Sequence, residues 1–296
     1  MSMDDFLLYV FCLVDDEVQA LFREGRLRQR GPAPTLADSE VITIELVGEF
    51  LGLDRDKAAF AHFRRYHLDA FPRLAQITRT TFARQAANLW WVKRSLQEHL
   101  AKRLTAGDPR WLVDSVPVYA CQFRRGGFCR RFAGEAAFGK DFVAQQTFYG
   151  FRLHLRVSPE GIIEALELAA ANVAEIHLVA ELSPPPGSVG LGDRNYWNPR
   201  AWEELAAEGV RLLAPFRMKS KDPDPVRSRR LNRKRWMIET VIGQLAERLH
   251  VKRTWARDLW HLCHRILRKV LCHTVAAYLN VLLGRPPLEF DGLLEE

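Results

Sequence analysis

The chain has 296 residues, of which 48% are hydrophobic and 27% are charged, so it holds enough apolar material for one large or two modest packed domains. This composition excludes a disordered protein. The net charge of +7 favours polyanionic partners without identifying one. The acidic N-terminus lacks the basic region of a signal peptide, and no apolar run is long enough to cross a membrane, so we expect neither secretion nor membrane insertion.

Residues 1–106 have the pattern of a helical region. A helix start is expected at 35–40, where Asp38 and Glu40 favour the positive end of the helix dipole. Further helices are expected over 57–66 and over 80–104, the second capped by Thr80 and Thr81. Short helical patterns do not distinguish DNA binding from dimerisation, so both roles stay open for this region.

A turn signal at 106–109 marks the change to strands. The first strand, over 111–118, is apolar and is expected to stop near Pro117. The strand over 148–157 alternates apolar and polar residues, which predicts one buried face and one solvent face. A turn then returns the chain as a partner strand over 162–168.

The later elements follow in a regular order. They are a helix over 172–182, a strand over 188–191, a helix over 200–208, a strand over 210–216, a basic loop, a helix that carries Glu239, and helices within 255–283. This is the order of a ribonuclease-H-like domain. We therefore expect an α/β fold with a mixed five-stranded sheet and flanking helices, preceded by an all-helical N-terminal region and followed by C-terminal helices.

The expected division of the chain has three parts. Residues 1–106 form the N-terminal DNA-binding or dimerisation region, and residues 107–250 form the ribonuclease-H-like domain. Residues 251–296 form a helical extension that packs on the core.

Three acids stand where such a sheet would bring them together. Asp114 interrupts the first apolar strand, Asp193 follows a later strand, and Glu239 lies on the helix expected to cross the sheet. Carboxylate oxygens are the ligands that Mg²⁺ prefers. Two such ions about 4 Å apart can activate a nucleophile and stabilise a leaving oxygen in phosphoryl transfer. The three acids are therefore candidate catalytic residues and metal ligands.

The positive charge is confined to particular segments. Residues 217–235 contain nine Lys or Arg and two acids, which accounts for the whole net charge of +7. Such a segment favours contact with phosphates over a merely solvated loop. A second basic connection lies between 119 and 147. The candidate DNA-binding residues are Arg124, Arg125, Arg130, Arg131, Lys140, Arg194, Arg229, Arg230, Arg233, Lys234 and Arg235.

Two further patterns leave alternatives open. Trp197, close to Asp193, fits either stacking on a flipped base or burial under the following helix. The pairs Cys263–His264 and Cys272–His273 suggest zinc, but they lie on an apolar helical pattern that favours buried thiols. The odd number of cysteines, without paired spacing, fits a reduced cytoplasmic compartment.

Several of these motifs resemble one known family. The stretches 114–118, 149–154, 192–196 and 238–240, together with 35–45, are similar to the insertion-sequence 982 family of DDE transposases. The resemblance covers most of the chain. It implies a ribonuclease-H-like catalytic domain with an Asp-Asp-Glu triad at Asp114, Asp193 and Glu239.

The resemblance also implies an activity and partners. It implies a polynucleotidyl transferase that uses Mg²⁺, with Mn²⁺ as a substitute and two ions per site. The substrates would be transposon terminal inverted repeats and target DNA, handled by a homodimer in a synaptic complex on bacterial or archaeal nucleoid DNA. Two rivals remain: a ribonuclease-H-like nuclease that does not join strands, and a non-catalytic DNA-binding descendant of a transposase.

Overall fold

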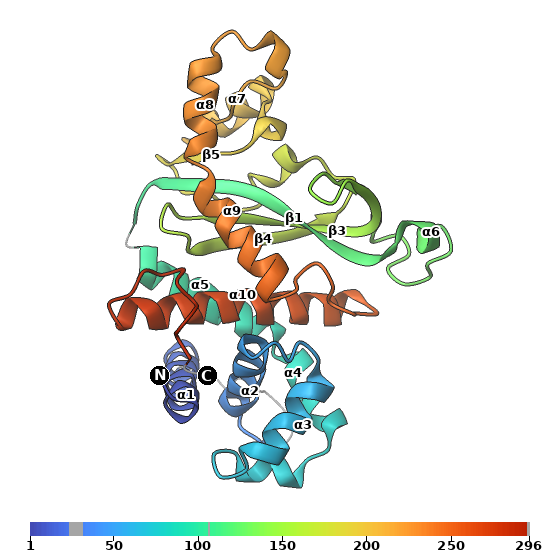
Figure 1. Ribbon diagram of the computed structural model, residues 1–296, viewed down its shortest axis with the longest axis vertical. Coiled ribbons are helices and arrows are strands. Elements are labelled where there is room, and N and C mark those ends of the chain that lie inside the picture. The colour runs from blue at the N-terminus through green and yellow to red at the C-terminus, as the bar shows by residue number, and fades with distance from the viewer. Residues whose placement is uncertain (24–31, 106, 295–296) are drawn as a thin grey trace. The chain divides into compact units, whose positions relative to one another are not determined.

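The computed structural model describes residues 1–23, 32–105 and 107–294, and these form two compact units (Figure 1). The helical unit consists of the described residues of Met1–Leu100, Arg248–His250 and Asp258–Glu296. The sheet unit consists of those of Ala101–Glu247 and Val251–Arg257. Within the described ranges, every helix is too short or too polar to span a lipid bilayer.

The helical unit is built around two buried helices. Its elements are α1 (Met3–Leu21), α2 (Asp38–Phe50), α3 (Asp56–Tyr66), the 3-10 helix η1 (Pro72–Gln76), α4 (Arg79–Asn88), the first part of α5 (Trp90–Thr105) and α10 (Leu259–Leu282). Helix α2 packs against α1, α3, α4 and α10. This confirms the expected helical N-terminal region, and α10 packs with these helices.

The helix expected over 80–104 is wrong in its detail, because two helices occupy this stretch. The cap is Thr78, whose hydroxyl accepts a hydrogen bond from the Thr81 amide, and α4 ends at Asn88 with Leu89 as its C-cap. There the Ala86 carbonyl accepts hydrogen bonds from the Leu89 amide and from the buried Lys93 ammonium group. Tertiary contacts of this kind decide a helix break that the local sequence does not indicate.

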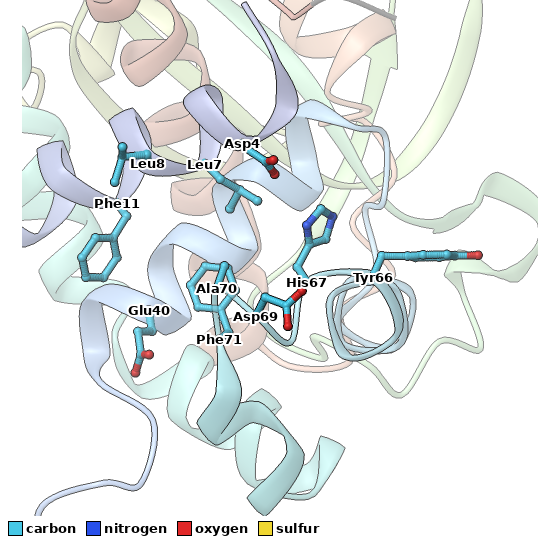
Figure 2. A pocket seen from close by; sticks show the side chains of 10 residues that line it. All are labelled: Asp4, Leu7, Leu8, Phe11, Glu40, Tyr66, His67, Asp69, Ala70 and Phe71. Carbon is cyan, nitrogen blue, oxygen red and sulfur yellow. The ribbon is translucent and has the colours of Figure 1, made fainter.

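A pocket of about 430 Å³ opens in the helical unit between α1, α2 and the turn after α3 (Figure 2). Leu7 and Phe71 form part of its apolar wall, and Asp4, Glu40 and Asp69 contribute carboxylates. Burial lowers the pKa of His67 at its rim, and the neighbouring His62 lowers it further.

The sheet unit contains one mixed sheet with the order β2-β3-β1-β5-β6, and β4 pairs with β3 beside β2. The strands are β1 (Arg110–Gln122), β2 (Ala137–Asp141), β3 (Gln146–Val157), β4 (Ile163–Ala170), β5 (Val189–Leu191) and β6 (Arg211–Leu213). Strand β1 is antiparallel to β3 and parallel to β5. The expected ribonuclease-H-like arrangement is therefore confirmed. The short β2 is an additional strand within the connection that we expected to be a loop.

Strand β1 continues past Pro117, where we expected it to stop. Strand β5 pairs with Arg110–Leu112, and among the described residues no strand pairs with the rest of that edge of β1. On this edge the Tyr119 amide donates a hydrogen bond to the Lys252 carbonyl. The backbone nitrogen of Pro117, which carries no hydrogen, faces the same edge because it lies two residues earlier in the strand. A proline is tolerated there because no ladder hydrogen bond is lost.

The polar face of β3 is covered, which corrects the expectation of a solvent face. His154 is fully buried, Arg152 donates to Glu175, and Arg156 donates to the Ser183 carbonyl. The covering segment contains the 3-10 helix η2 (Glu175–Leu178) and not the longer helix expected over 172–182. Arginines that alternate along a strand therefore serve here as internal anchors.

The segment expected as a basic loop contains a helix. After the 3-10 helices η3 (Arg194–Tyr196) and η4 (Lys219–Lys221), and α7 (Pro199–Ala207), the chain forms α8 (Pro225–Arg233). Asp224 caps α8 by accepting from the Arg227 amide, and Pro225 occupies its first turn, a position that proline favours. The helix α9 (Trp236–Gly243) follows and lies against β1 (Figure 1).

Candidate active site

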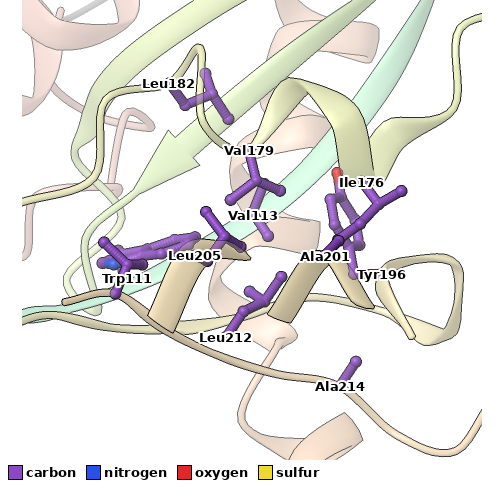
Figure 3. Packing of buried hydrophobic residues seen from close by; sticks show 11 residues of the cluster. Trp111, Val113, Ile176, Val179, Leu182, Tyr196, Ala201, Leu205, Leu212 and Ala214 are labelled. Atoms are coloured by element: carbon purple, nitrogen blue, oxygen red, sulfur yellow. The ribbon is translucent and has the colours of Figure 1, made fainter. Parts of the chain in front are cut away.

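A cluster of buried apolar side chains, shown in Figure 3, includes residues that adjoin three acidic positions and forms the floor of the site. Val113, Ile176 and Tyr196 belong to this cluster and are buried. Val113 directly precedes Asp114, and Ile176 directly follows Glu175. Tyr196 closes the turn that begins at Asp193. Because close-packed side chains have little freedom, the floor fixes the backbone under each acid.

The sheet register places Asp114 and Asp193 side by side. In the parallel pair of β1 and β5, Leu112 is the partner of Leu191. Asp114 and Asp193 each follow their paired leucine by two residues, at the carboxyl end of the β5 pairing. Ligand sites of open α/β sheets lie at such strand ends.

Asp114 is held by two donors. Its Oδ1 accepts from the Ser115 amide at 2.8 Å, and its Oδ2 accepts from the Arg235 guanidinium at 2.5 Å. Burial raises the pKa of Asp114 to about 7, although Arg235 opposes the shift, and the charges of Asp193 and Glu175 add to it. Negative charge is therefore concentrated here beyond what the protein itself neutralises.

Asp193 lies in a tight turn that depends on Gly192. A Cβ atom at Gly192 would lie 2.6 Å from the Tyr196 ring, so any larger residue would displace the ring from the floor. Asp193 Oδ1 accepts from the Asn195 amide at 2.8 Å. Burial raises the pKa of Asp193, and the charge of Glu175 raises it further.

Glu239 is placed differently from the two aspartates. Its side chain is 61% exposed on α9, and its Oε1 lies 3.6 Å from Arg235 Nη1. The Arg235 guanidinium thus contacts both Glu239 and Asp114. On the opposite face of α9, Ile238 and Val241 are buried as the helical pattern predicts.

Glu175 is a fourth acid at the site, which the sequence reasoning missed. Its Oε1 accepts from Ser115 Oγ at 2.7 Å and from Arg152 at 3.1 Å, and its Oε2 accepts from Asn195 Nδ2 at 3.3 Å. In the sequence it resembles a helix-capping residue. The available signal was its position after the hairpin, on the connection that leads to the strand before Asp193.

A comparison with known families now identifies the domain. A family model described as a transposase DDE domain matches residues 108–259, just over half of the chain. The chain belongs to this family. The matched range includes all four acids described above. No curated protein and no solved structure matches the chain.

The acids of the transposase domain fit the divalent metals that DDE domains use. The donors are carboxylate oxygens, which suit a hard cation, and the buried Tyr196 hydroxyl has no hydrogen-bond partner among the described residues. Burial is the main cause of the raised pKa of this tyrosine, and the charges of Glu175, Asp114 and Asp193 each raise it further. A polar group left unpaired beside three carboxylates suits a site that takes a hydrated cation.

A different acidic group, in the helical unit, does not look like a metal site. Among the described residues, Glu45, Asp56 and His264 are the one group of three that brings possible ligand atoms within 4.8 Å of one another. Lys93 and Arg268 already neutralise these carboxylates. The group is therefore part of a buried ion-pair network.

The structure divides the proposed DNA-contacting residues of the transposase into two groups. Nine have exposed side chains, and the side chains of the other two bind groups within the protein. Those with exposed side chains are Arg124, Arg125, Arg130, Arg131, Lys140, Arg229, Arg230, Arg233 and Lys234. Arg194 donates a hydrogen bond to the Phe216 carbonyl at 2.6 Å. The side chain of Arg235 is only 9% exposed and forms an ion pair with Asp114.

The aromatic side chains near these residues also differ in their surroundings. Trp197 packs edge-on against Trp202 and Phe216 at 4.7 Å each, which favours its burial under the following helix. Phe132 is buried against Phe151, whereas Phe128 is 91% exposed beside the arginines.

Proposed function

We propose that this chain is a DNA transposase that cleaves transposon ends and joins them to target DNA, using Asp114, Asp193 and Glu239 as its catalytic triad. The observation that carries the proposal is the register that brings Asp114 and Asp193 to one level of two adjacent parallel strands. The motifs further favour a member of the insertion-sequence 982 family.

The two aspartates have the main chemical role in this proposal. Asp114 and Asp193 would hold two Mg²⁺ or Mn²⁺ ions, and the ions would supply positive charge that stabilises the nucleophilic and the leaving oxygen of a phosphodiester. The Arg235 guanidinium forms ion pairs with both Asp114 and Glu239 and so holds the two carboxylates near each other. Glu239, whose exposed carboxylate lies 3.6 Å from the Arg235 guanidinium, completes the site as its third acid.

DNA is the partner that the exposed charges suit. Helix α8 presents Arg229, Arg230, Arg233 and Lys234 immediately before Arg235, so DNA phosphates bound there lie on the path to the acids. The arginines of 124–131 offer a second phosphate-contacting surface. Two ends must be joined, so we propose a homodimer in the synaptic complex, acting on the nucleoid of a bacterium or archaeon.

The two rival functions predict different products. A nuclease of the same fold would cleave DNA without joining it, and a non-catalytic descendant would only bind. The presence of all three triad acids, on β1, in the turn after β5 and on α9, favours catalysis over binding alone.

Cleavage of a duplex that carries the inverted repeat flanking the gene tests the proposal. The wild-type protein should cut the end in Mg²⁺ or Mn²⁺. Asp114→Asn and Asp193→Asn should each reduce the rate by at least about a thousandfold, because a lost carboxylate removes transition-state stabilisation of several kcal/mol. Undiminished cleavage by folded Asp114→Asn would remove the triad assignment.

A further inference from the structure

Glu175 connects the two segments that carry the catalytic aspartates. Through Ser115 it contacts the residue that follows Asp114, and through Asn195 it contacts the turn that begins at Asp193. Arg152 of β3 fixes the same carboxylate and donates a hydrogen bond to Ser115 Oγ as well. One side chain therefore accepts hydrogen bonds from β1, from β3 and from the turn after β5.

The Ser115–Glu175–Arg152 part of this connection is largely buried, whereas Asn195 contacts Glu175 from the surface. The side chains of Glu175 and Arg152 are only 10% and 11% exposed. Ser115 Oγ also lies within a closed set of contacts, between Glu175 and Arg152. The buried part of this charge-assisted network holds its geometry because loss of the Ser115 or Arg152 contact leaves a largely buried polar group unpaired.

We propose that Glu175 is a positioning residue of the active site, fixing the separation of Asp114 and Asp193 so that both bind the divalent cation. The inference rests on the proposed function, because it takes the two aspartates as the cation ligands. Groups that orient carboxylate ligands in this way contribute about ten- to a hundredfold to metal affinity.

The chemistry around Tyr196 supports the same role. Its hydroxyl is fully buried, has no hydrogen-bond partner among the described residues, and lies close enough to Glu175, Asp114 and Asp193 to feel all three charges. Figure 3 shows its ring beside Ile176, the residue after Glu175. The buried hydroxyl therefore lies within the same group of acids that Glu175 connects.

A calorimetric titration of the full-length protein with Mn²⁺ alone, in the absence of DNA, tests this inference. Glu175→Ala should weaken Mn²⁺ binding by about tenfold or more. Glu175→Gln keeps an acceptor oxygen for Ser115 and Arg152, so it should recover part of the loss. Thermal unfolding in EDTA identifies any variant that does not fold. If Glu175→Ala does not fold, the double variant Ser115→Ala/Asn195→Ala replaces it, with the same expected direction.

Glu164→Ala is the matched control. Glu164 pairs with Arg156 at 3.3 Å in the same sheet and is buried to a similar degree, but it contacts neither aspartate segment. Its loss should lower stability and leave the Mn²⁺ affinity unchanged. The inference is wrong if the folded Glu175 variants bind Mn²⁺ like the wild type, or if Glu164→Ala weakens binding equally. If Asp114→Asn leaves Mn²⁺ binding intact, the proposed function itself fails.

Discussion

At the scale of single residues, the site is defined by carboxylates whose charges the protein does not fully neutralise. Asp114 has one guanidinium, Arg235, which it shares with Glu239. Asp193 and Glu175 add negative charge, and burial raises the pKa of Asp114 to about 7. This is the pattern expected of carboxylates that function with a bound cation, since a cation removes the repulsion.

Asp114 should make the metal-free protein less stable as the pH rises. Its folded pKa of about 7 lies above the ordinary value of 3.8, so its contribution to stability is present below about pH 4 and is lost as the pH rises through 7. A shift of this size corresponds to about 2–4 kcal/mol. Urea unfolding in EDTA between pH 5 and 8 should show a steeper loss for wild type than for Asp114→Asn. Parallel curves for the two proteins would contradict the assigned pKa.

The sequence predicts some of these residues and not others, for a physical reason. Asp114 interrupts an apolar strand and Asp193 follows another, and both local patterns can be recognised in the sequence. Glu175 acquires its role only through Ser115 and Asn195, which are distant in sequence or lie on another element. The local pattern around it resembles a helix cap, so a sequence reading assigns it a different function.

At the scale of elements, α8 presents the cationic surface. Asp224 and Pro225 start this helix, and most of its Arg side chains are exposed. The density of arginines suggested a loop, because like charges repel and no apolar stripe is present. The local start signal was nevertheless in the sequence, and Ser228 anchors the helix by accepting from the Phe216 amide.

Removing the four exposed cations of α8 should change the salt dependence of DNA binding. The variant has Arg229, Arg230, Arg233 and Lys234 replaced by Gln. Each lost phosphate contact should reduce the slope of log K against log salt by about 0.9. Fluorescence anisotropy on an end duplex between 50 and 200 mM salt, the range over which such slopes are about linear, measures this. Arg200→Gln, exposed on α7, is the control, and an unchanged slope in the fourfold variant would exclude α8 as a DNA-contacting surface.

Loss of the α8 cap should destabilise that helix alone. Asp224→Ala removes the acceptor of the Arg227 amide, at a cost of about 1 kcal/mol. Hydrogen exchange should therefore speed up at the amides of the first turn of α8 and stay constant in β1 and β3. Faster exchange throughout the sheet would show that α8 supports the whole unit.

At the scale of the whole molecule, both units have a buried apolar core, and the helical unit adds a buried ion-pair network. In that network Arg268 contacts Glu45, Glu49 and Asp56, and Lys269 also pairs with Glu49. Sequence periodicity predicted helices here, but it could not predict that α10 turns charged residues toward the charged residues of α2.

Arg268→Ala should strongly destabilise the helical unit, because it leaves several buried carboxylates without their main partner. The expected loss is about 3–5 kcal/mol in the free energy of unfolding. Arg94→Ala, which removes a half-exposed pair with Glu98, should cost less than about 1 kcal/mol. Chemical denaturation compares the two variants. A small loss for Arg268→Ala would mean that the remaining cations suffice to balance the network.

Strand transfer is the most direct test of the proposed function. A pre-cleaved end duplex with a free 3′-hydroxyl, a target plasmid and Mg²⁺ are incubated with wild type or with Asp114→Asn. The wild type should join the labelled end to the plasmid, and Asp114→Asn should not. Cleavage of end DNA by the wild type without any joined product would contradict transposition and identify a nuclease of the same fold.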